Sequence, residues 1–173
     1  RYVGPSENRG ENATVPIRKA TLQPLIAWAV RLVNDFDPST YQTAEDMTVK
    51  EMQALSGACI VLIAYLTGMR PKEVCSLRID CLREVEGDDG SVRHEVHGVA
   101  FKNERDEDGR HVSEGRERPD PWLTIEQGAR AIRVQQHLAR VLGSTMLIAP
   151  SQQSDPDRRI AGLTPAHTNR RIR

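Results

Sequence analysis

An abrupt corner between two helices is the feature of this sequence that most constrains its fold. An apolar stretch over residues 60–66 stops at Gly68, and Pro71 follows three residues later with Glu73 just beyond it. Glycine suits the left-handed residue that ends a helix, and proline suits the first position of the next helix. The sequence therefore predicts a long helix ending at Gly68 and a short one over residues 71–80, meeting at a corner.

A single arginine, Arg70, lies within this corner. It is next to the free backbone N–H groups at the start of the second helix, where a negatively charged group is favoured. A guanidinium held there can donate two parallel hydrogen bonds to one phosphate. Arg70 is therefore the first candidate functional residue. We interpret Glu73 as an acid that supports the corner rather than as a catalytic group.

Composition is that of an ordinary folded domain. A chain of 173 residues can bury a real core, and 38% hydrophobic with 28% charged residues is usual for a globular protein. The sequence has no run of about 18 apolar residues and no visible signal peptide, so nothing in it points to a membrane or to secretion.

Cysteine and histidine positions do not indicate a metal site. Cys59, Cys75 and Cys81 have neither a metal-binding spacing nor a disulfide pattern, so we expect reduced, buried thiols. His94 and His97 are three residues apart on an expected strand and therefore point to opposite faces.

Net charge argues against a nucleic-acid partner, although its distribution does not. Basic and acidic residues number 24 each, so the formal net charge is zero, whereas DNA-binding domains usually carry a basic excess. Residues 157–173 nevertheless hold five arginines against one acid, and residues 84–89 hold four acids and no base. Local fields can steer DNA even when the sum of the charges is zero. Composition thus weakens a DNA-binding function without excluding it.

Helical periodicity predicts three longer helices. The first covers about residues 21–36, and the second opens at Thr48 and runs to the corner. Thr48 and Glu51 have the spacing of a capping box, in which each side chain bonds the other residue's backbone N–H. The third is expected to begin after Thr124, which has a glutamine at the same spacing, and to stop at Gly143.

Turn and strand patterns occupy the middle of the chain. Residues 87–90 are typical of a hairpin turn, and the alternation over residues 92–97 predicts a strand. Gly98 shifts the alternation by one residue, which suggests a bulge before the strand resumes. A charged, exposed loop is expected over residues 103–120, and residues 122–125 predict a further short strand. The expected order is helices, a small antiparallel sheet and helices again.

The corner also carries a longer pattern, T-G-x-R-x-x-E-x-x-x-L over residues 67–77, with Asp80 shortly after it. This pattern resembles the first catalytic-arginine box of the tyrosine recombinase (phage integrase) family. The order of elements over residues 48–173 is similar to that family's catalytic domain, in which the arginine box precedes a three-stranded sheet and more helices. The resemblance implies a mainly α (α+β) fold, the helical DNA breaking-rejoining fold with a small three-stranded antiparallel sheet, incomplete at the C-terminus.

The same resemblance implies a division of the chain. Residues 1–13 are polar and are interpreted as disordered or linker. Residues 14–40 contain a lead-in helix similar to one in some bacterial integrases. Residues 41–173 would be a partial recombinase catalytic domain, and the segment that opens with Leu163 and Thr164 is similar to the helix before the family's second box.

The resemblance further implies chemistry and partners. Members of the family cleave DNA through a 3′-phosphotyrosyl intermediate without a metal or cofactor, with two arginines and a histidine at the phosphate and a lysine as general acid. Arg70 takes the place of the first arginine, and Lys102 falls at the strand end where the family has its lysine; an exposed strand-end lysine is the plainer alternative. The implied partners are double-stranded DNA and, on it, other copies in a homotetramer. The implied location is the bacterial cytoplasm at the nucleoid, with no membrane.

Two features depart from the family pattern. Residues 167–170 have the H-x-x-R spacing of the second box, but their surroundings differ and we interpret them as a solvated basic helix face. The tyrosines, Tyr2, Tyr41 and Tyr65, all precede Arg70, whereas the family's nucleophile follows the second box. Tyr65 is expected to pack in the core. The sequence as given is therefore expected not to cleave DNA and to be a fragment of a longer recombinase.

A second interpretation stays open. The chain could be a non-catalytic helical module, for DNA binding or protein interaction, that has the fold of an integrase without its chemistry. Zero net charge and the missing tyrosine favour this interpretation. The arginine corner, the position of Lys102 and the order of elements favour the recombinase.

Overall fold

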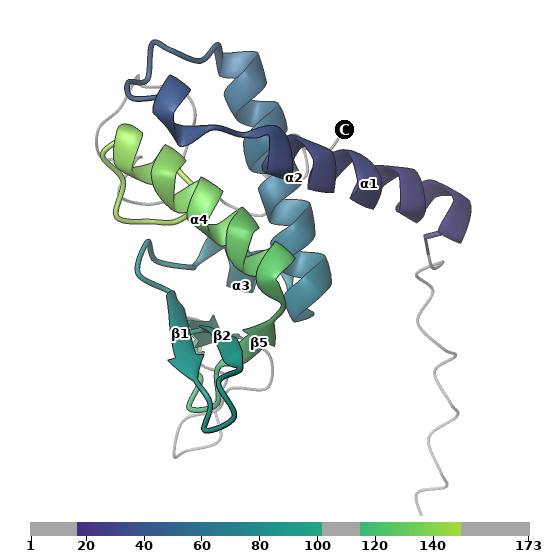
Figure 1. Cartoon of the computed structure of the whole chain (residues 1–173), viewed down its shortest axis with the longest axis vertical. Coiled ribbons are helices and arrows are strands. Elements are labelled where there is room, and N and C mark those ends of the chain that lie inside the picture. Colours follow the sequence, from purple (N-terminus) through teal and green to yellow (C-terminus); the bar gives the residue numbers. More distant parts are fainter. Residues whose placement is uncertain (1–16, 102–114, 150–173) are drawn as a thin grey trace, which may run out of the picture.

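The computed structural model describes residues 17–101 and 115–149, and it is a mixed helical and β structure in this part (Figure 1). In chain order the elements are α1 (Lys19–Asp35), the short 3-10 helix η1 (Pro38–Thr40), α2 (Val49–Thr67), α3 (Pro71–Cys75), β1 (Leu82–Glu86), β2 (Val92–Val96), β3 (Val99–Ala100), β4 (Arg116–Glu117), β5 (Trp122–Thr124) and α4 (Glu126–Val141). The α+β class expected from the sequence is confirmed.

Helix α2 has the two ends that its sequence predicts. The Thr48 hydroxyl accepts from the Glu51 N–H at 3.2 Å, and the Glu51 carboxylate accepts from the Thr48 N–H at 2.9 Å. These reciprocal bonds are the predicted capping box. At the other end Gly68 has φ of 71°, the left-handed conformation that glycine adopts without steric cost.

Helix α2 is also the central helix of the core. By length and composition it is the one helix in the described part that could cross a membrane. Half of its apolar window is buried inside the structure, however, and it packs against both α1 and α4. Burial within the fold therefore accounts for the apolar character of this helix.

One apolar core joins all the long helices to the sheet. Its fully buried side chains include Val33 of α1, Leu62 of α2, Ile132 of α4 and Val96 of β2. Arg130 of α4 adds hydrogen bonds to α1, because its guanidinium donates to the carbonyls of Val33 and Asn34 at 3.3 and 3.1 Å. The C-terminal half of α1 is thus packed against α2 and α4, whereas its N-terminal half projects beyond the other helices (Figure 1).

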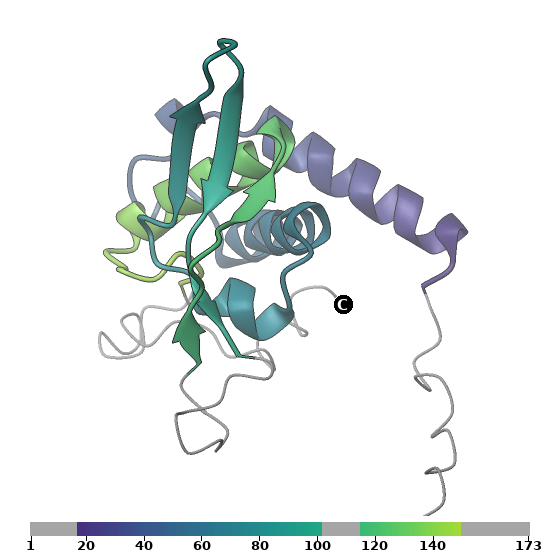
Figure 2. The same ribbon diagram turned by 90° about the horizontal axis from the view of Figure 1, so that it is seen from below.

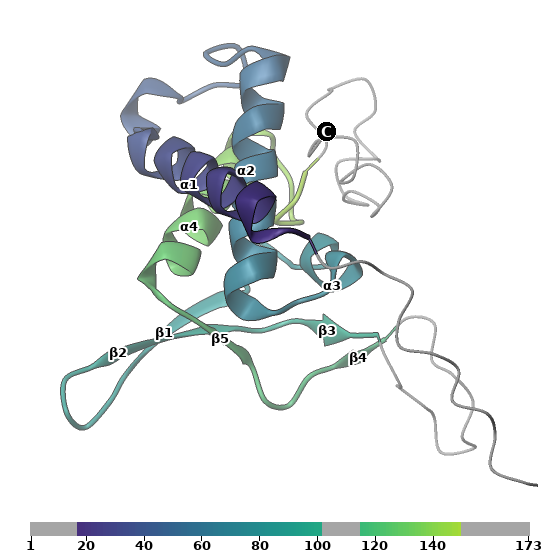
Figure 3. The same cartoon turned by 90° about the vertical axis from the view of Figure 1, so that its right-hand side faces the viewer.

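The three-stranded sheet has the order β1-β2-β5 and is antiparallel throughout. Strands β1 and β2 form a hairpin around the predicted turn at residues 87–90, with Glu86 opposite Val92. The strands lie along one side of the helical part, and the hairpin extends past it (Figures 2 and 3). The small antiparallel sheet expected from the sequence is confirmed.

Gly98 is a crossing point between two sheets rather than a bulge. Strand β2 ends at Val96, and the next residues enter β3, which pairs with β4 in a separate two-stranded sheet. A Cβ at position 98 would come within 2.9 Å of the Leu77 Cδ2 atom, so a larger residue there would require the buried Leu77 side chain to shift. Strand β4 also lies inside the segment expected to be a loop over residues 103–120.

One predicted helix end and one predicted helix cap differ from the structure. Helix α3 ends at Cys75, not at residue 80, because the chain beyond it pairs with a distant segment: the Leu147 N–H donates to the Leu77 carbonyl at 2.8 Å and the Ile79 N–H to the Thr145 carbonyl at 3.1 Å. The start of α4 has no side-chain cap, because the Thr124 hydroxyl is buried without a hydrogen-bond partner.

Candidate functional site

The Arg70 corner is built by local backbone requirements. The Thr67 hydroxyl donates to the Ile63 carbonyl at 2.6 Å and accepts from the Met69 N–H at 3.1 Å, which bends the chain tightly after α2. Met69 is then buried, and Arg70 takes an extended conformation before Pro71 opens α3. The corner therefore has the arrangement that the sequence predicts, with Arg70 at its outside.

Glu73 binds Arg70 twice. One carboxylate oxygen, Oε2, accepts from the Arg70 backbone N–H at 2.7 Å, and the other, Oε1, accepts from the Arg70 Nη1 atom at 3.1 Å. The Glu73 side chain is only 2% exposed, while that of Arg70 is 55% exposed. A buried carboxylate with both oxygens bonded fixes the root of the arginine and one edge of its guanidinium.

This arrangement can bind an anion. The guanidinium is anchored by Glu73 but more than half of the Arg70 side chain reaches solvent, where its planar donors are accessible. Because the geometry is set before any ligand arrives, little side-chain entropy would be lost on binding. The interpretation of Glu73 as a support for the corner agrees with these contacts.

The end of strand β3 reaches the same helix. The Lys72 Nζ atom lies 4.0 Å from the centroid of the Phe101 ring, so α3 contacts the residue that immediately precedes Lys102. Lys102 itself lies outside the described residues, and its role stays a prediction. Lys72 is a basic side chain near Arg70 that the sequence reasoning did not weigh.

The structure describes two of the three tyrosines, and one of them differs from the expectation. Tyr65 was expected in the core, but it is 54% exposed near the end of α2, so that expectation is wrong. The Tyr41 ring stacks on Phe36 at a centroid distance of 5.3 Å, and its carbonyl is bonded to the His137 Nε2 atom at 2.5 Å. Tyr2 and residues 167–170 lie outside the described part of the chain.

The cysteines are buried thiols, as the sequence predicts. Cys59, Cys75 and Cys81 are all buried, and none of them is in a disulfide. Burial raises the pKa of the Cys81 thiol to about 12 and that of Cys59 higher still, which disfavours the reactive thiolate. Neither Cys59 nor Cys81 therefore has the environment of a nucleophile.

A second group of polar side chains, at the sheet, was missed by the sequence reasoning. Arg133 of α4 forms ion pairs with Glu84 of β1 and Glu126 of α4, and both carboxylates lie within 4 Å of the His94 ring of β2. His94 points toward α4, while the His97 Nε2 atom lies 3.3 Å from the Glu95 carboxylate. Among residues 17–101 and 115–149, no group of three or more His, Cys, Asp or Glu side chains could hold a metal ion.

Comparisons with known proteins add no relative. No protein-family model, no curated protein and no solved structure matches this chain. The evidence for a function is therefore the corner geometry and the sequence pattern that builds it.

Proposed function

We propose that this chain is part of the catalytic domain of a tyrosine recombinase and that Arg70 binds the phosphate of a DNA strand. The full protein would act in site-specific recombination or integration, cleaving and rejoining DNA through a 3′-phosphotyrosyl intermediate. The sequence carries no tyrosine after Arg70, so the nucleophile would have to come from outside it.

The Arg70–Glu73 pair carries this proposal. A single buried carboxylate holds both the backbone N–H and the guanidinium of Arg70, yet leaves the side chain largely exposed. The bond of Glu73 to the Arg70 backbone N–H is one that a helix start commonly makes, but its second oxygen also fixes the guanidinium, so the donors of Arg70 are oriented before a ligand binds. Preorganised donors of this kind stabilise the extra charge that develops on a phosphate during strand transfer.

The arrangement of the neighbouring elements also supports the proposal. Helix α3 follows the arginine directly, and through Lys72 it contacts Phe101 at the end of β3. In the proposed enzyme Lys102 would follow at that strand end and protonate the leaving oxygen. The α+β order of helices and sheet is compatible with this fold class.

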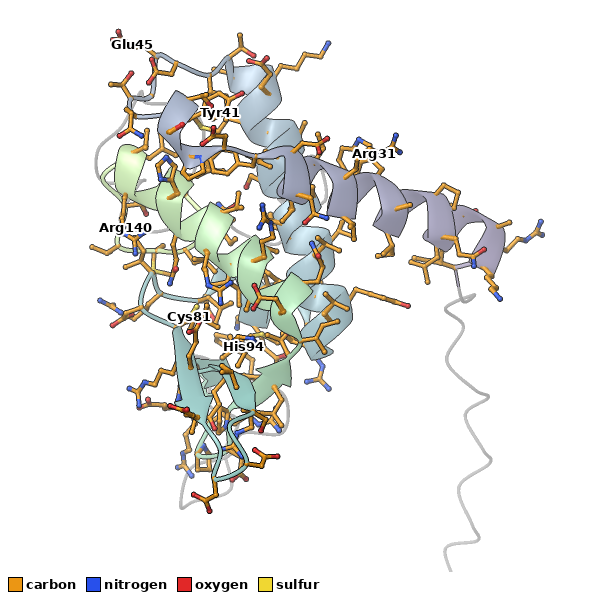
Figure 4. All side chains as sticks on the ribbon, in the orientation of Figure 1. Arg31, Tyr41, Glu45, Cys81, His94 and Arg140 are labelled. Atoms are coloured by element: carbon orange, nitrogen blue, oxygen red, sulfur yellow. The ribbon has the colours of Figure 1, made fainter. Side chains whose placement is uncertain are left out.

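Binding of duplex DNA over a series of salt concentrations tests the proposal. Replacing Arg70 by alanine should weaken binding roughly tenfold or more, because a charge-assisted hydrogen bond contributes about 1.5–3 kcal/mol. The slope of log K against log salt should also fall by about 0.9, the value for one lost phosphate contact. The matched control is Arg140→Ala, which removes an exposed arginine of α4 (Figure 4) and should leave affinity and slope near those of the wild type.

Equal binding by Arg70→Ala and the wild type would contradict the proposal. So would an equal loss in the Arg140→Ala variant, because general charge rather than the corner would then explain the affinity. Weak binding of the wild type, with little dependence on salt, would favour the second candidate function.

That second candidate is a non-catalytic helical module for DNA binding or protein interaction. The observation in its favour is the position of the tyrosines, all of which precede Arg70. In the described part, the Tyr41 ring is already engaged in stacking on Phe36. This function would use the same fold without strand cleavage.

A further inference from the structure

The face of the sheet that points toward the helices changes from apolar to charged along the β1–β2 hairpin. Val96 and Trp122 are cross-strand partners and are both buried, so they mark the inward face. His94 lies two residues from Val96 and therefore points the same way, opposite Glu84 of β1 and Thr124 of β5. Next to the apolar pair Leu82 and Val96, on the side of the hairpin turn, this face therefore carries the polar pair Glu84 and His94.

Those side chains meet a matching set on α4. The His94 Nε2 atom lies 3.0 Å from the Glu126 Oε2 atom, and its Nδ1 atom lies 3.9 Å from the Glu84 Oε1 atom. The Arg133 guanidinium donates to Glu126 at 2.8 Å and also to Glu84. His94 is only 9% exposed on its side chain, and Figure 4 shows it where the sheet meets the first turns of α4.

The Arg133–Glu126 pair lies within α4, and the other contacts cross between elements. Arg133 links β1 to α4 through Glu84, and His94 links β2 to α4 through Glu126. The hairpin beyond them extends past the helical part (Figure 3) and Val92, near its tip, is more than half exposed. Strand β2 pairs with β5 only from Val96 to His94, so nearer the tip the hairpin has no further strand beside it. Among the described residues, Glu84 and His94 are the hairpin side chains that bond to α4.

We propose that Glu84, His94, Glu126 and Arg133 form a charge clamp, which holds the β1–β2 hairpin on α4 and releases it when the ion pairs are broken or screened. The partly exposed pairs are sensitive to salt, whereas the apolar core of α1, α2 and α4 is not. The hairpin would therefore open locally under conditions in which the helices stay folded. This inference does not depend on the proposed recombinase function.

Amide hydrogen exchange of the whole chain at fixed pH tests the clamp. In the variant Arg133→Met, which keeps an apolar stem of similar length, the amides of the β1–β2 ladder should exchange roughly tenfold faster or more, as expected for loss of charge-assisted hydrogen bonds. The amides of α2 in the same sample should keep their wild-type rates. Raising salt from about 0.05 M to about 1 M should speed hairpin exchange in the wild type but have little effect in the variant.

The matched control breaks an ion pair on the same hairpin that does not reach α4. Arg93→Met removes the pair between the Arg93 Nη2 and Glu95 Oε1 atoms, which are 2.7 Å apart on the outward face of β2. Its hairpin amides should exchange at close to the wild-type rate.

Three results with the variants would overturn the clamp. They are unchanged hairpin exchange in Arg133→Met, an equal acceleration of hairpin and α2 amides, and an equal effect of Arg93→Met. The salt series on the wild type requires no variant, and hairpin exchange that does not change with salt would by itself refute the inference.

Discussion

At the scale of single residues, the candidate site depends on how Glu73 is bonded. The carboxylate accepts two hydrogen bonds from Arg70 and is almost fully buried. In Glu73→Gln one acceptor oxygen becomes an NH₂ group, so a donor would face either the backbone N–H or the guanidinium of Arg70. An unmet buried donor costs about 1–3 kcal/mol, and we expect the free energy of unfolding, measured by urea denaturation, to fall by that amount.

The control for this prediction is Glu45→Gln, because Glu45 is exposed in the loop before α2 (Figure 4). An exposed substitution of this kind should change stability by no more than about 0.5 kcal/mol. If Glu73→Gln proved as stable as Glu45→Gln, the two bonds to Arg70 would not anchor the corner.

Glu126 is a second residue whose contacts predict a measurable effect, in this case on pH dependence. Its hydrogen bonds from the Arg133 guanidinium lower the pKa of the Glu126 carboxyl below its usual value. A lowered folded-state pKa means that the ionised carboxyl stabilises the fold above about pH 4.3, and that this contribution is lost as pH falls through the folded value.

The comparison that isolates this contribution is wild type against Glu126→Gln. The wild type should be more stable at pH 7, by on the order of 0.5 kcal/mol after allowance for solvent screening. The difference should shrink toward zero as the pH falls below about 4.3. A difference that stays constant from pH 7 to pH 3 would mean that charge at position 126 plays no part.

At the scale of whole elements, helix α2 provides the clearest test of a local signal. Its capping box satisfies two backbone N–H groups at the first turn, those of Thr48 and Glu51. Thr48→Ala removes the hydroxyl and should lower the free energy of unfolding by about 1 kcal/mol. Thr48→Ser keeps the hydroxyl and should lose much less. Thermal denaturation of the three proteins decides this, and equal losses in both variants would show that the methyl group matters instead.

The sequence predicted the features of these elements that depend on neighbouring residues. Thr48 caps α2, Gly68 ends it and Pro71 opens α3, because each is a requirement of the local backbone. Arg70 and Glu73 could be paired for the same reason, since they are three residues apart in one turn. The turn at residues 87–90 was predicted correctly on the same basis.

The features that the sequence did not predict depend on distant residues. Helix α3 is short because Leu77 and Ile79 pair with a segment almost 70 residues further on (Leu77 with Leu147, Ile79 with Thr145). Gly98 marks a change of sheet, which no local pattern distinguishes from a bulge. The charge clamp was missed because Glu84, His94 and Arg133 lie on three different elements. Tyr65 was misplaced because apolar periodicity does not specify which side of the last turn of a helix stays exposed.

At the scale of the whole molecule, α1 shares the apolar core of the other long helices. Its buried Val33 belongs to the same core as α2 and α4, and Arg130 bonds the carbonyls at its C-terminal end. Elements that share one core are expected to unfold in a single cooperative transition. The projecting N-terminal half of α1 is the part in which this cooperativity would be weakest.

The two tryptophans test this prediction, because Trp28 lies on α1 and Trp122 on β5. Variants Trp122→Phe and Trp28→Phe each leave one fluorescent reporter, and each reporter's urea midpoint is compared with the circular-dichroism midpoint of the same variant. We expect the two midpoints to coincide in both variants. Adding Val33→Ala should lower the stability seen by both reporters equally, by roughly 1.5–2.5 kcal/mol, since it removes buried methyl groups and leaves a cavity. If the Trp28 signal changed at lower urea than the helical signal, or if Val33→Ala moved only the Trp28 transition, α1 would be a separate unit attached to the remaining fold.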